Sequence, residues 1–409
     1  MPTLLLPACL LITCLVAAGA RAEMPAKDDS VIRVATYNVS FYRNRAGQLL
    51  EDLQAEDAQA QKIAEVIRRV QPDMLLLNEF DYQAPNHINT AMYFSCEFFY
   101  LKREGLSEVR LARPTYLPVN TGVPSGLDID GDGSTDGPND CFGYGRYPGQ
   151  YGMAAYARWR PDMRKVRTFQ KFLWKDMPGA KLPVDPKTGE SYYSDEILNV
   201  FRLSSKSHWD VPIKVKTGDQ TWTLHLLCSH PTPPVFDGPE DRNGRRNHDE
   251  IRLWADYIDP ARSDYLVDDQ GHRGGLEAGA HFVILGDLNA DPVDGDSAGE
   301  NINQLLNHPL INASSTPTSE GAVEASRLQA ELNAKHHGDA SHDTADFSGD
   351  GHGNLRVDYV LPSQTLQVVH SGVFWPKPGE PGSEAIRATD HRLVWVDLKL
   401  PPADQPAAD

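Results

Sequence analysis

The sequence predicts an α/β protein, and three observations lead to that prediction. Residues 31–37 and 73–77 are apolar runs of strand length, and residues 49–70 between them carry apolar side chains at helical spacing. A third apolar run, residues 282–285, has no polar break, which is typical of a strand covered on both faces. Because strand, helix and strand in succession build layered sheets, an α/β domain is expected.

Length and composition limit the number of domains and the kinds of ligand to be expected. The chain has 409 residues, 40% of them hydrophobic, which is enough for one large domain with insertions or for two modest ones. The formal net charge of −18 argues against a broad basic surface for gripping long nucleic acid, although it leaves room for a local basic patch.

The amino terminus has the pattern of a secretory signal peptide. Residues 4–18 are apolar, and Ala20-Arg21-Ala22 follows as a small-x-small cleavage site. The alternative is lipid attachment at Cys14, which is disfavoured because Thr13 stands where a small residue is usual. We therefore expect a signal peptide over residues 1–22 and a secreted or periplasmic protein. No later stretch is long and apolar enough to span a membrane.

The remaining elements follow from alternation, apolar runs and turn residues. Further strands are expected at residues 151–159, 165–174, 200–203, 211–215, 221–228, 355–361, 365–373 and 393–400, and further helices at 249–258 and 302–306. The catalytic domain is expected over residues 23–400, with insertions near 84–150, 231–247 and 312–354 and a disordered tail at 401–409.

Polar side chains gather at the predicted strand ends. Asp287 and Asn289 follow the apolar run at 282–285, and their spacing of two puts both side chains on the same side of an extended chain. Each such residue alone also fits a turn or a hydrogen-bonded structural role. So many polar groups at buried strand ends are costly unless they serve a function. The set is Asn38, Glu79, His230, Asp287, Asn289, Asp358, Asp390 and His391.

In order and local context, seven segments resemble the endonuclease/exonuclease/phosphatase superfamily, the DNase I-like metal-dependent phosphoesterases. The segments are ATYNVSF, LLLNEF, GMAAYARW, LLCSH, ILGDLNADP, RVDYVLPS and TDHRLVWVDL, and they span residues 31–400. The resemblance implies a four-layer α/β sandwich, in which two mixed β-sheets pack face to face with helices outside. It also implies metal-dependent hydrolysis of a phosphate ester.

The resemblance also assigns roles to the strand-end residues. Asn38, Glu79 and Asp390 would hold Mg²⁺ or Mn²⁺, since hard cations take oxygen ligands. The remaining residues would act on the phosphate and the attacking water: Asp287 with Asn289 would orient or deprotonate the water, His391 held by Asp358 would contact the phosphate, and His230 would donate to the phosphate or the leaving group.

Arginines outside these segments are candidates for substrate binding. Arg242, Arg245 and Arg246 lie in the predicted 231–247 loop, where they either grip a second acidic group of the substrate or belong to a solvated loop. Arg158, near the end of the strand predicted at 151–159, is a further candidate.

An acidic loop and the cysteines give two more expectations. Asp128, Asp130, Asp132 and Asp136 match the front of a calcium loop, although Asn139 stands where such loops have Glu, so a structural Ca²⁺ site and an unliganded turn both remain open.

In an oxidising compartment, Cys96 and Cys141 are the expected disulfide pair, because both lie in a loop-rich region, whereas Cys228 lies in an apolar strand.

Together these features predict a secreted metal-dependent phosphoesterase acting on a phosphodiester or a phosphomonoester. The alternatives are a nuclease specific for DNA or RNA and a sphingomyelinase-like phospholipid phosphodiesterase. A binding module on the same scaffold is disfavoured, because binding alone does not need both a water-orienting Asp287 and an Asp358–His391 pair. No stretch indicates an obligate protein partner, and the sequence leaves the oligomeric state open.

Overall fold

The computed structural model describes residues 24–25, 27, 30–82, 89–100, 105–111, 114–217, 220–297 and 300–401. The predicted signal peptide at 1–22 lies outside the described residues, and so does the predicted tail beyond residue 401. Among the helices of the described ranges, none has the length and apolar character needed to cross a membrane.

Twelve strands and seven α-helices make up the regular structure of these ranges. The strands are β1 (Val31–Phe41), β2 (Met74–Phe80), β3 (Met153–Ala157), β4 (Arg167–Thr168), β5 (His208–Thr217), β6 (Gln220–Ser229), β7 (His281–Asp287), β8 (Ala345–Phe347), β9 (Gly353–Leu355), β10 (Asp358–Pro362), β11 (Gln367–Phe374) and β12 (Leu393–Lys399). The helices are α1 (Gln48–Gln54), α2 (Ala58–Val70), α3 (Thr90–Phe94), α4 (Asp195–Leu198), α5 (Arg242–Tyr257), α6 (Asn303–Leu306) and α7 (Glu320–Leu328).

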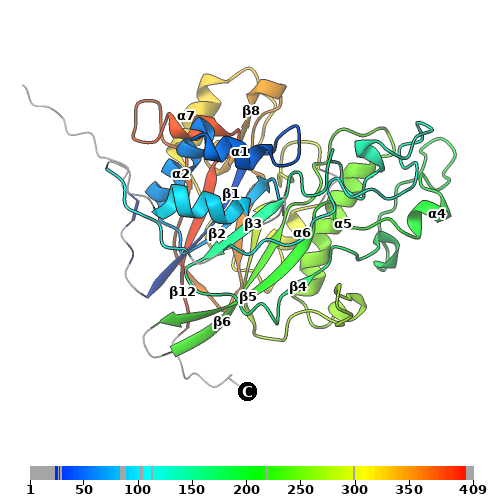
Figure 1. The fold of residues 1–409 in the computed structure, drawn as a ribbon, viewed down its shortest axis with the longest axis horizontal. Helices are drawn as coiled ribbons and strands as arrows, with labels where there is room; N and C mark the ends of the chain where they lie inside the picture. Colours follow the sequence, from blue (N-terminus) through cyan, green and yellow to red (C-terminus); the bar gives the residue numbers. More distant parts are fainter. Residues whose placement is uncertain are drawn as a thin grey trace, which may run out of the picture.

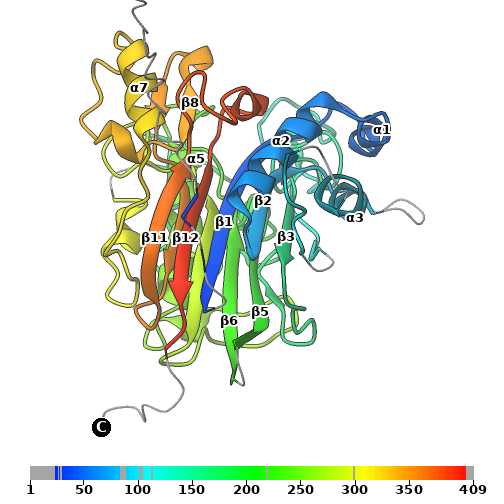
Figure 2. The same ribbon diagram turned by 90° about the vertical axis from the view of Figure 1, so that its left-hand side faces the viewer.

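Two five-stranded mixed sheets form the centre of the molecule (Figure 1). One has the order β11-β12-β1-β2-β3 and the other β10-β7-β6-β5-β4. In each sheet the central pair, β1 with β2 and β6 with β7, is parallel, and the other pairs are antiparallel. Figure 2 shows the first sheet in the foreground with β11, β12, β1, β2 and β3 side by side.

Alternating side chains on the strands build two apolar layers. On β7, Val283 and Leu285 face the first sheet, whereas Phe282 and Ile284 pack with Trp254 of α5. On the outer side of the first sheet, the apolar face of α2 packs on the strands, and Figure 2 shows α2 lying across them. Helix, sheet, sheet and helix therefore follow one another, which confirms the predicted four-layer sandwich.

The structure departs from the expected elements in four places. The strand expected at 165–174 is reduced to Arg167–Thr168, and residues 200–203 form no strand. The loop expected at 231–247 ends early, because α5 already begins at Arg242. The insertion expected at 312–354, whose sequence shows little periodicity, contains α7 and the β8–β9 hairpin. These two elements lie at one end of the sandwich, at the top in Figure 2.

Candidate active site

The two sheets meet at Asp287, the last residue of β7. The alternation that turns Val283 and Leu285 toward the first sheet turns the Asp287 side chain the same way. There its Oδ2 accepts a hydrogen bond of 3.0 Å from the side-chain amide of Asn38 on β1. Residues 249 positions apart are thus joined across the interface between the sheets, and both are buried.

Asn78 of β2 anchors this end of the sandwich. Its Oδ1 accepts hydrogen bonds from the Asp287 backbone N–H at 3.1 Å and from the Thr36 hydroxyl at 3.3 Å. Its Nδ2 donates to the Ser229 carbonyl at 3.2 Å. The adjacent Gly286 has no room for a side chain, since a Cβ there would lie 2.0 Å from the Ser229 carbonyl oxygen. Gly286 thus lets β7 lie close to the end of β6, and the Asn78 side chain ties the first sheet to both strands directly behind Asp287.

His230 and Asn289 border Asp287 from the second sheet. His230 follows β6, and its Nε2 lies 3.4 Å from Asp287 Oδ2, while its buried Nδ1 has no hydrogen-bond partner among the described residues. Asn289 donates its backbone N–H to Asp287 Oδ1 at 2.9 Å and its side-chain amide to the Pro231 carbonyl at 3.1 Å. One contact fixes the carboxylate, and the other fixes the segment after His230.

His391 reaches the same point from the other side. Its Nδ1 lies 2.9 Å from Asp358 Oδ2 and its Nε2 lies 3.7 Å from Asp287 Oδ2. Thr344 donates its hydroxyl to Asp358 Oδ2 at 2.9 Å, and a β-bridge joins Ala345 to His391. The 312–354 insertion thus holds the Asp358–His391 pair in place, and its own contacts with the pair are buried.

Glu79 and Asp390 complete the set at the open side of the site. The partly buried Glu79 carboxylate lies next to the Asn38 amide, and the Ser40 hydroxyl donates to Asp390 Oδ1 at 3.4 Å. Glu79, Ser40 and Asn289 all have positive φ, at 55°, 49° and 51°. Left-handed backbone at non-glycine residues costs energy and concentrates at functional sites, because the surrounding structure must hold it.

Charge is unevenly distributed over these groups. Burial opposes the imidazolium form of His391, but the carboxylates of Asp358 and Asp287 outweigh it and raise the pKa of His391 to about 10. Burial likewise opposes ionisation of Asp287, yet the imidazoles of His391 and His230 hold its pKa below the usual range. At neutral pH a cationic His391 therefore faces an ionised Asp287.

His230 behaves in the opposite way to His391. Burial and the nearby Lys206 ammonium lower the pKa of His230 to about 4, so this imidazole is neutral at pH 7. Burial also lowers the pKa of Lys206, while the carboxylates of Glu250, Glu79 and Asp287 raise it. Lys206 is 7% exposed, and its Nζ makes one hydrogen bond, of 3.5 Å, to the Pro231 carbonyl.

The oxygen groups at the open side fit a divalent cation. Burial raises the pKa of Glu79 to about 7, because the charge of His391 only partly offsets the loss of water around the carboxylate. This partly buried carboxylate, next to the Asn38 amide and near the Asp390 carboxylate, offers oxygen ligands of the kind that a hard divalent cation takes. The ligand atoms of the site that lie within 4.8 Å of one another are those of Asp287, Asp358 and His391. Among these, His391 Nδ1 is already bonded to Asp358.

Three further residues belong to the site although the sequence did not single them out for it. Lys206 precedes β5, which pairs antiparallel with β6, so Lys206 lies beside the segment that follows Ser229. Asn78 precedes Glu79 on β2, and Thr344 comes from the insertion. A polar residue inside an otherwise apolar strand, as at Asn78, was the one sequence signal available.

Arg246 is not a substrate-binding residue in this structure, which corrects the sequence prediction. Its guanidinium is buried and donates to the carbonyls of Leu203 at 2.8 Å, Phe142 at 2.6 Å and Arg202 at 2.9 Å. The same group lies 4.6 Å from the ring centroid of Phe201. Arg246 therefore ties α5 to the loops beside it.

The other three predicted arginines have different surroundings. Arg242 pairs with Glu240 and donates to the Phe236 carbonyl at 3.1 Å, and Arg245 is half-buried in α5. Arg158 follows β3, and the register pairs Ala157 with Met74 at the start of β2. Arg158 thus lies at the end of the sheet opposite to Glu79, beside Asp73 at 3.6 Å. The run of arginines is the start of a helix rather than a loop.

The acidic loop differs in part from its predicted arrangement. The carboxylates that come within 4.8 Å of one another are those of Asp128, Asp130 and the buried Asp140. Asp132 instead accepts the Ser134 backbone N–H at 2.7 Å. Asp136 is also outside the cluster, and calcium binding by this loop stays a prediction.

The predicted disulfide is absent. Cys96 is an exposed free thiol, and Cys141 is a buried one whose Sγ lies 3.6 Å from the Gly145 carbonyl oxygen. Cys228 is a third free thiol, buried in β6 as its apolar context predicts.

Comparison with known proteins agrees with this geometry. The family model described as Endonuclease/Exonuclease/phosphatase family matches residues 35–391. The chain belongs to this family. It is accordingly a metal-dependent hydrolase of phosphoric esters, and the strand-end residues described above lie within the matched range. No curated protein matches the sequence.

Several solved structures share the general arrangement. A family protein from Beutenbergia cavernae DSM 12333 has 16% identity and a TM-score of 0.49, over 93% of this chain and 73% of that chain. One from Leptotrichia buccalis C-1013-b has 12% identity and a TM-score of 0.45, over 89% and 98%. The human Nocturnin catalytic domain with bound sulfate has 13% identity and a TM-score of 0.42, over 91% and 94%.

Proposed function

We propose that this family member hydrolyses a phosphodiester or phosphomonoester by attack of a water molecule that Asp287 orients, with His230 and His391 at the phosphate and Mg²⁺ or Mn²⁺ as the cation. One observation carries the proposal. Asp287 Oδ2 is the common neighbour of Asn38 Nδ2 at 3.0 Å, His230 Nε2 at 3.4 Å and His391 Nε2 at 3.7 Å. A general base, two imidazoles and an amide therefore converge on one point.

The ionised Asp287 supports the role of general base. Its carboxylate accepts a proton from the water as the water oxygen attacks phosphorus, and the P–O bond to the leaving group breaks. The Asn38 amide and the Asn289 backbone N–H each hold one carboxylate oxygen, which fixes the direction in which Asp287 can accept that proton. Overall, one water adds across the P–O bond, and an alcohol leaves.

Three groups would balance the negative charge of the reacting phosphate. His391, kept cationic by Asp358 and Asp287, presents its Nε2 toward the site. His230, which is neutral, donates a ring N–H to a phosphate or leaving-group oxygen. The Lys206 ammonium lies near His230 and adds a positive charge on this side of the phosphate.

Glu79 and Asp390, with Asn38 beside them, are the residues proposed to hold the cation. When bound, the cation supplies positive charge to a non-bridging phosphate oxygen and so stabilises the charge that builds at phosphorus. The protein side of this role is to hold the Glu79 carboxylate partly buried at one position, and the left-handed backbone of Glu79 indicates that the surrounding structure fixes this residue.

We further propose that the protein is exported. The support is the apolar stretch at residues 4–18 and the Ala20-Arg21-Ala22 site. Intact-mass analysis of protein recovered outside the cytoplasm should give a chain beginning at Glu23. A full-length cytoplasmic chain, or a lipid-modified Cys14, would contradict export by this signal.

The test of the function is a substrate panel with defined metals. Purified protein with Mg²⁺, Mn²⁺ or Ca²⁺ is assayed on DNA, RNA, sphingomyelin, phosphatidylcholine and aryl phosphomono- and diesters. EDTA should abolish hydrolysis, and Glu79→Gln should lower it by on the order of 10²-fold or more, because an ionised ligand becomes neutral. Glu331→Gln, at an exposed position, is the matched control. Full activity in EDTA would refute the metal mechanism.

A further inference from the structure

Three tyrosines form a continuous aromatic surface that the catalytic roles leave unexplained. Tyr42, directly after β1, is 44% exposed, and Tyr144, in the loop before β3, is 52% exposed. The ring of Tyr151 lies between them, with centroid distances of 4.9 Å to Tyr42 and 6.5 Å to Tyr144. We call Tyr42, Tyr144 and Tyr151 the tyrosine patch.

The tyrosine patch adjoins the candidate active site. The Tyr151 backbone N–H donates to Asp81 Oδ1 at 3.0 Å, and Asp81 is two residues beyond Glu79 on the same segment. Tyr42 is two residues beyond Ser40, whose hydroxyl donates to Asp390. Burial and then the charge of Glu79 raise the pKa values of both Tyr42 and Tyr151, as expected for rings close to that carboxylate.

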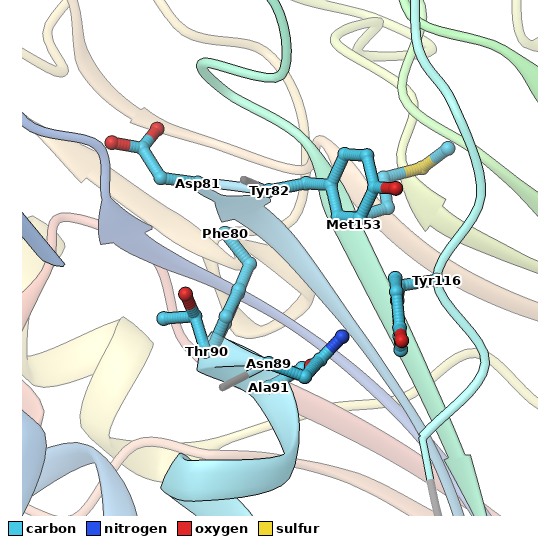
Figure 3. Close-up of a pocket in the computed structure, with 8 residues that line it drawn as sticks. All are labelled: Phe80, Asp81, Tyr82, Asn89, Thr90, Ala91, Tyr116 and Met153. Atoms are coloured by element: carbon cyan, nitrogen blue, oxygen red, sulfur yellow. The ribbon is translucent and has the colours of Figure 1, made fainter. Parts of the chain in front are cut away.

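The patch is fixed at an energetic cost. Tyr151 has φ 56°, a left-handed conformation that bulky side chains rarely adopt. The buried Asp81 holds it there, because its carboxylate also accepts the Tyr147 hydroxyl and the Arg43 backbone N–H. In Figure 3 the Asp81 carboxylate points away from the shallow hollow that Tyr82 and Tyr116 line. Retained strain of this kind indicates that the position of the Tyr151 ring matters.

Packing does not account for these rings. Tyr156 and Tyr257, which are buried, donate their hydroxyls to the Ala91 carbonyl at 2.9 Å and to Asp210 at 2.6 Å, whereas the buried Tyr37 hydroxyl has no partner among the described residues. Among the described residues, no hydroxyl of the tyrosine patch has a hydrogen-bond partner. Two exposed rings, with the half-buried Tyr151 ring between them, therefore offer a stacking surface at the mouth of a phosphoesterase site.

The side chain of Arg146, on the same loop as Tyr144, carries a positive charge. Arg146 is exposed and donates from its guanidinium to the Asn44 side-chain oxygen at 2.9 Å. Within the described part of the chain it forms no ion pair with a carboxylate. An aromatic surface with an uncommitted guanidinium next to it suits a group that alternates planar bases and phosphates.

We propose that the tyrosine patch stacks on the base next to the scissile phosphate, which makes the substrate a nucleotide ester in single-stranded form, with Arg146 at the following phosphate. This inference rests on the proposed function, because it needs a phosphate held at Asp287 and His391. Stacking on an aromatic side chain is tolerant of base identity but requires an unpaired base. A chain with net charge −18 also lacks the broad positive surface that long duplexes need.

The experiment compares two single-stranded oligodeoxynucleotides that differ only in their bases. One carries ordinary bases, and the other carries abasic tetrahydrofuran residues, so both present the same phosphates. The wild-type protein should prefer the first by roughly 5- to 150-fold in kcat/KM, the range that stacking of one base gives. Tyr42→Ala and Tyr151→Ala should lose this preference by slowing only on the substrate with bases, whereas Tyr42→Phe and Tyr151→Phe should keep it.

The control variant is Tyr192→Ala, which removes a 37% exposed tyrosine near α4 and should leave the preference unchanged. Equal wild-type rates on the two oligonucleotides would overturn the inference, and so would a loss in the alanine variants that is equal on both. Hydrolysis of lipid or aryl esters but of neither oligonucleotide would overturn the inference and leave the proposed function standing. Hydrolysis of no phosphate ester at all would overturn both.

Discussion

Two buried polar clusters of this protein look alike in sequence and differ in what their side chains contact. The first, the catalytic cluster, comprises Asn38, His230, Asp287, Asp358 and His391. The second, the α5 cluster, comprises His208, Arg246, Asp249 and Glu250. Both are rich in charged and imidazole groups, and both are nearly inaccessible to water.

In the α5 cluster the polar atoms are satisfied mainly by fixed partners. Glu250 accepts the backbone N–H groups of Ser205 and Thr232, both at 2.6 Å. Arg246 donates to three carbonyls. His208 contacts the Ser204 hydroxyl at 2.7 Å and the Glu250 carbonyl at 2.8 Å. Such a cluster fastens segments together.

In the catalytic cluster the ionisable side chains face one another, and some atoms remain without partners. Asp358 Oδ1 and His230 Nδ1 are buried and have no hydrogen-bond partner among the described residues. Leaving such atoms unpaired costs free energy, which a structural cluster avoids. The contrast is that ionisable side chains of the catalytic cluster face one another, whereas Glu250 and Arg246 of the α5 cluster bind backbone groups.

The substitution Asp287→Asn is the most direct test of this difference between the two clusters. An amide cannot accept the proton of the attacking water, so kcat should fall by on the order of 10⁴-fold, the upper range for a general base. Thermal unfolding should also show a loss of stability, because the lowered pKa of Asp287 means that the folded state favours its ionised form and because His391 loses a facing carboxylate, so rates are compared per folded molecule. Asp296→Asn, an exposed position in the same loop region, is the control. Comparable rates in the two variants would remove Asp287 from the mechanism.

Arg246→Met tests the other side of the contrast. Three carbonyls and the nearby Glu250 would lose their cation, so we expect about 3–5 kcal/mol of lost stability in urea unfolding. Activity per folded molecule at low temperature should change less than about two-fold. Arg242→Met, which breaks a pair with Glu240 at the surface end of α5, should cost under about 1 kcal/mol. A kinetic defect without a loss of stability would contradict this structural role and indicate that Arg246 binds the substrate.

The Asp358–His391 pair should act as one unit. His391→Ala should slow catalysis by on the order of 10²-fold or more, because a cation at the phosphate is lost. Adding Asp358→Asn to His391→Ala should cost little further, since Asp358 works through the imidazole to which it is bonded. Single-turnover rates of the two single variants and the double variant settle the matter. Losses that multiply would show that the two residues act separately.

The smallest expected effect concerns acid stability and His208. Burial lowers the pKa of His208 from 6.5 to about 4, so between these values the unfolded chain binds a proton that the folded chain does not. Stability should therefore fall as pH falls, by about 2 kcal/mol between pH 7 and pH 5 from this group. Urea unfolding of His208→Gln should show a pH dependence weaker by that amount. His272→Gln, in an exposed loop, controls for the loss of an imidazole.

Local pattern was sufficient to predict much of the fold. The helical pattern at 49–70 is observed as two helices, α1 and α2, because its apolar residues keep helical spacing and Asp57 caps the second helix through the Ala60 N–H. The buried strand at 282–285 is observed within β7. Both signals lie within one element, so tertiary contacts could not overrule them.

The predictions that were wrong concern residues whose surroundings depend on contacts between distant segments. A run of arginines such as Arg245-Arg246 suggests surface, and only the carbonyls of Leu203 and Phe142 make Arg246 internal. Lys206 carries no motif, and its place in the site follows from the pairing of β5 with β6. The cysteine pairing failed for the same reason, since a loop-rich sequence does not fix where Cys96 and Cys141 lie.

The strand order has a consequence for when activity can arise during synthesis. β1 pairs with β12, so the first sheet combines residues from near the start of the described chain with residues 393–399. His391 immediately precedes β12, and Asn38 must meet Asp287 across 249 residues. A ribosome-bound chain therefore holds an incomplete catalytic centre until its last strand emerges. The phosphoesterase is thus inert for nearly the whole of its translation, without needing a separate inhibitor.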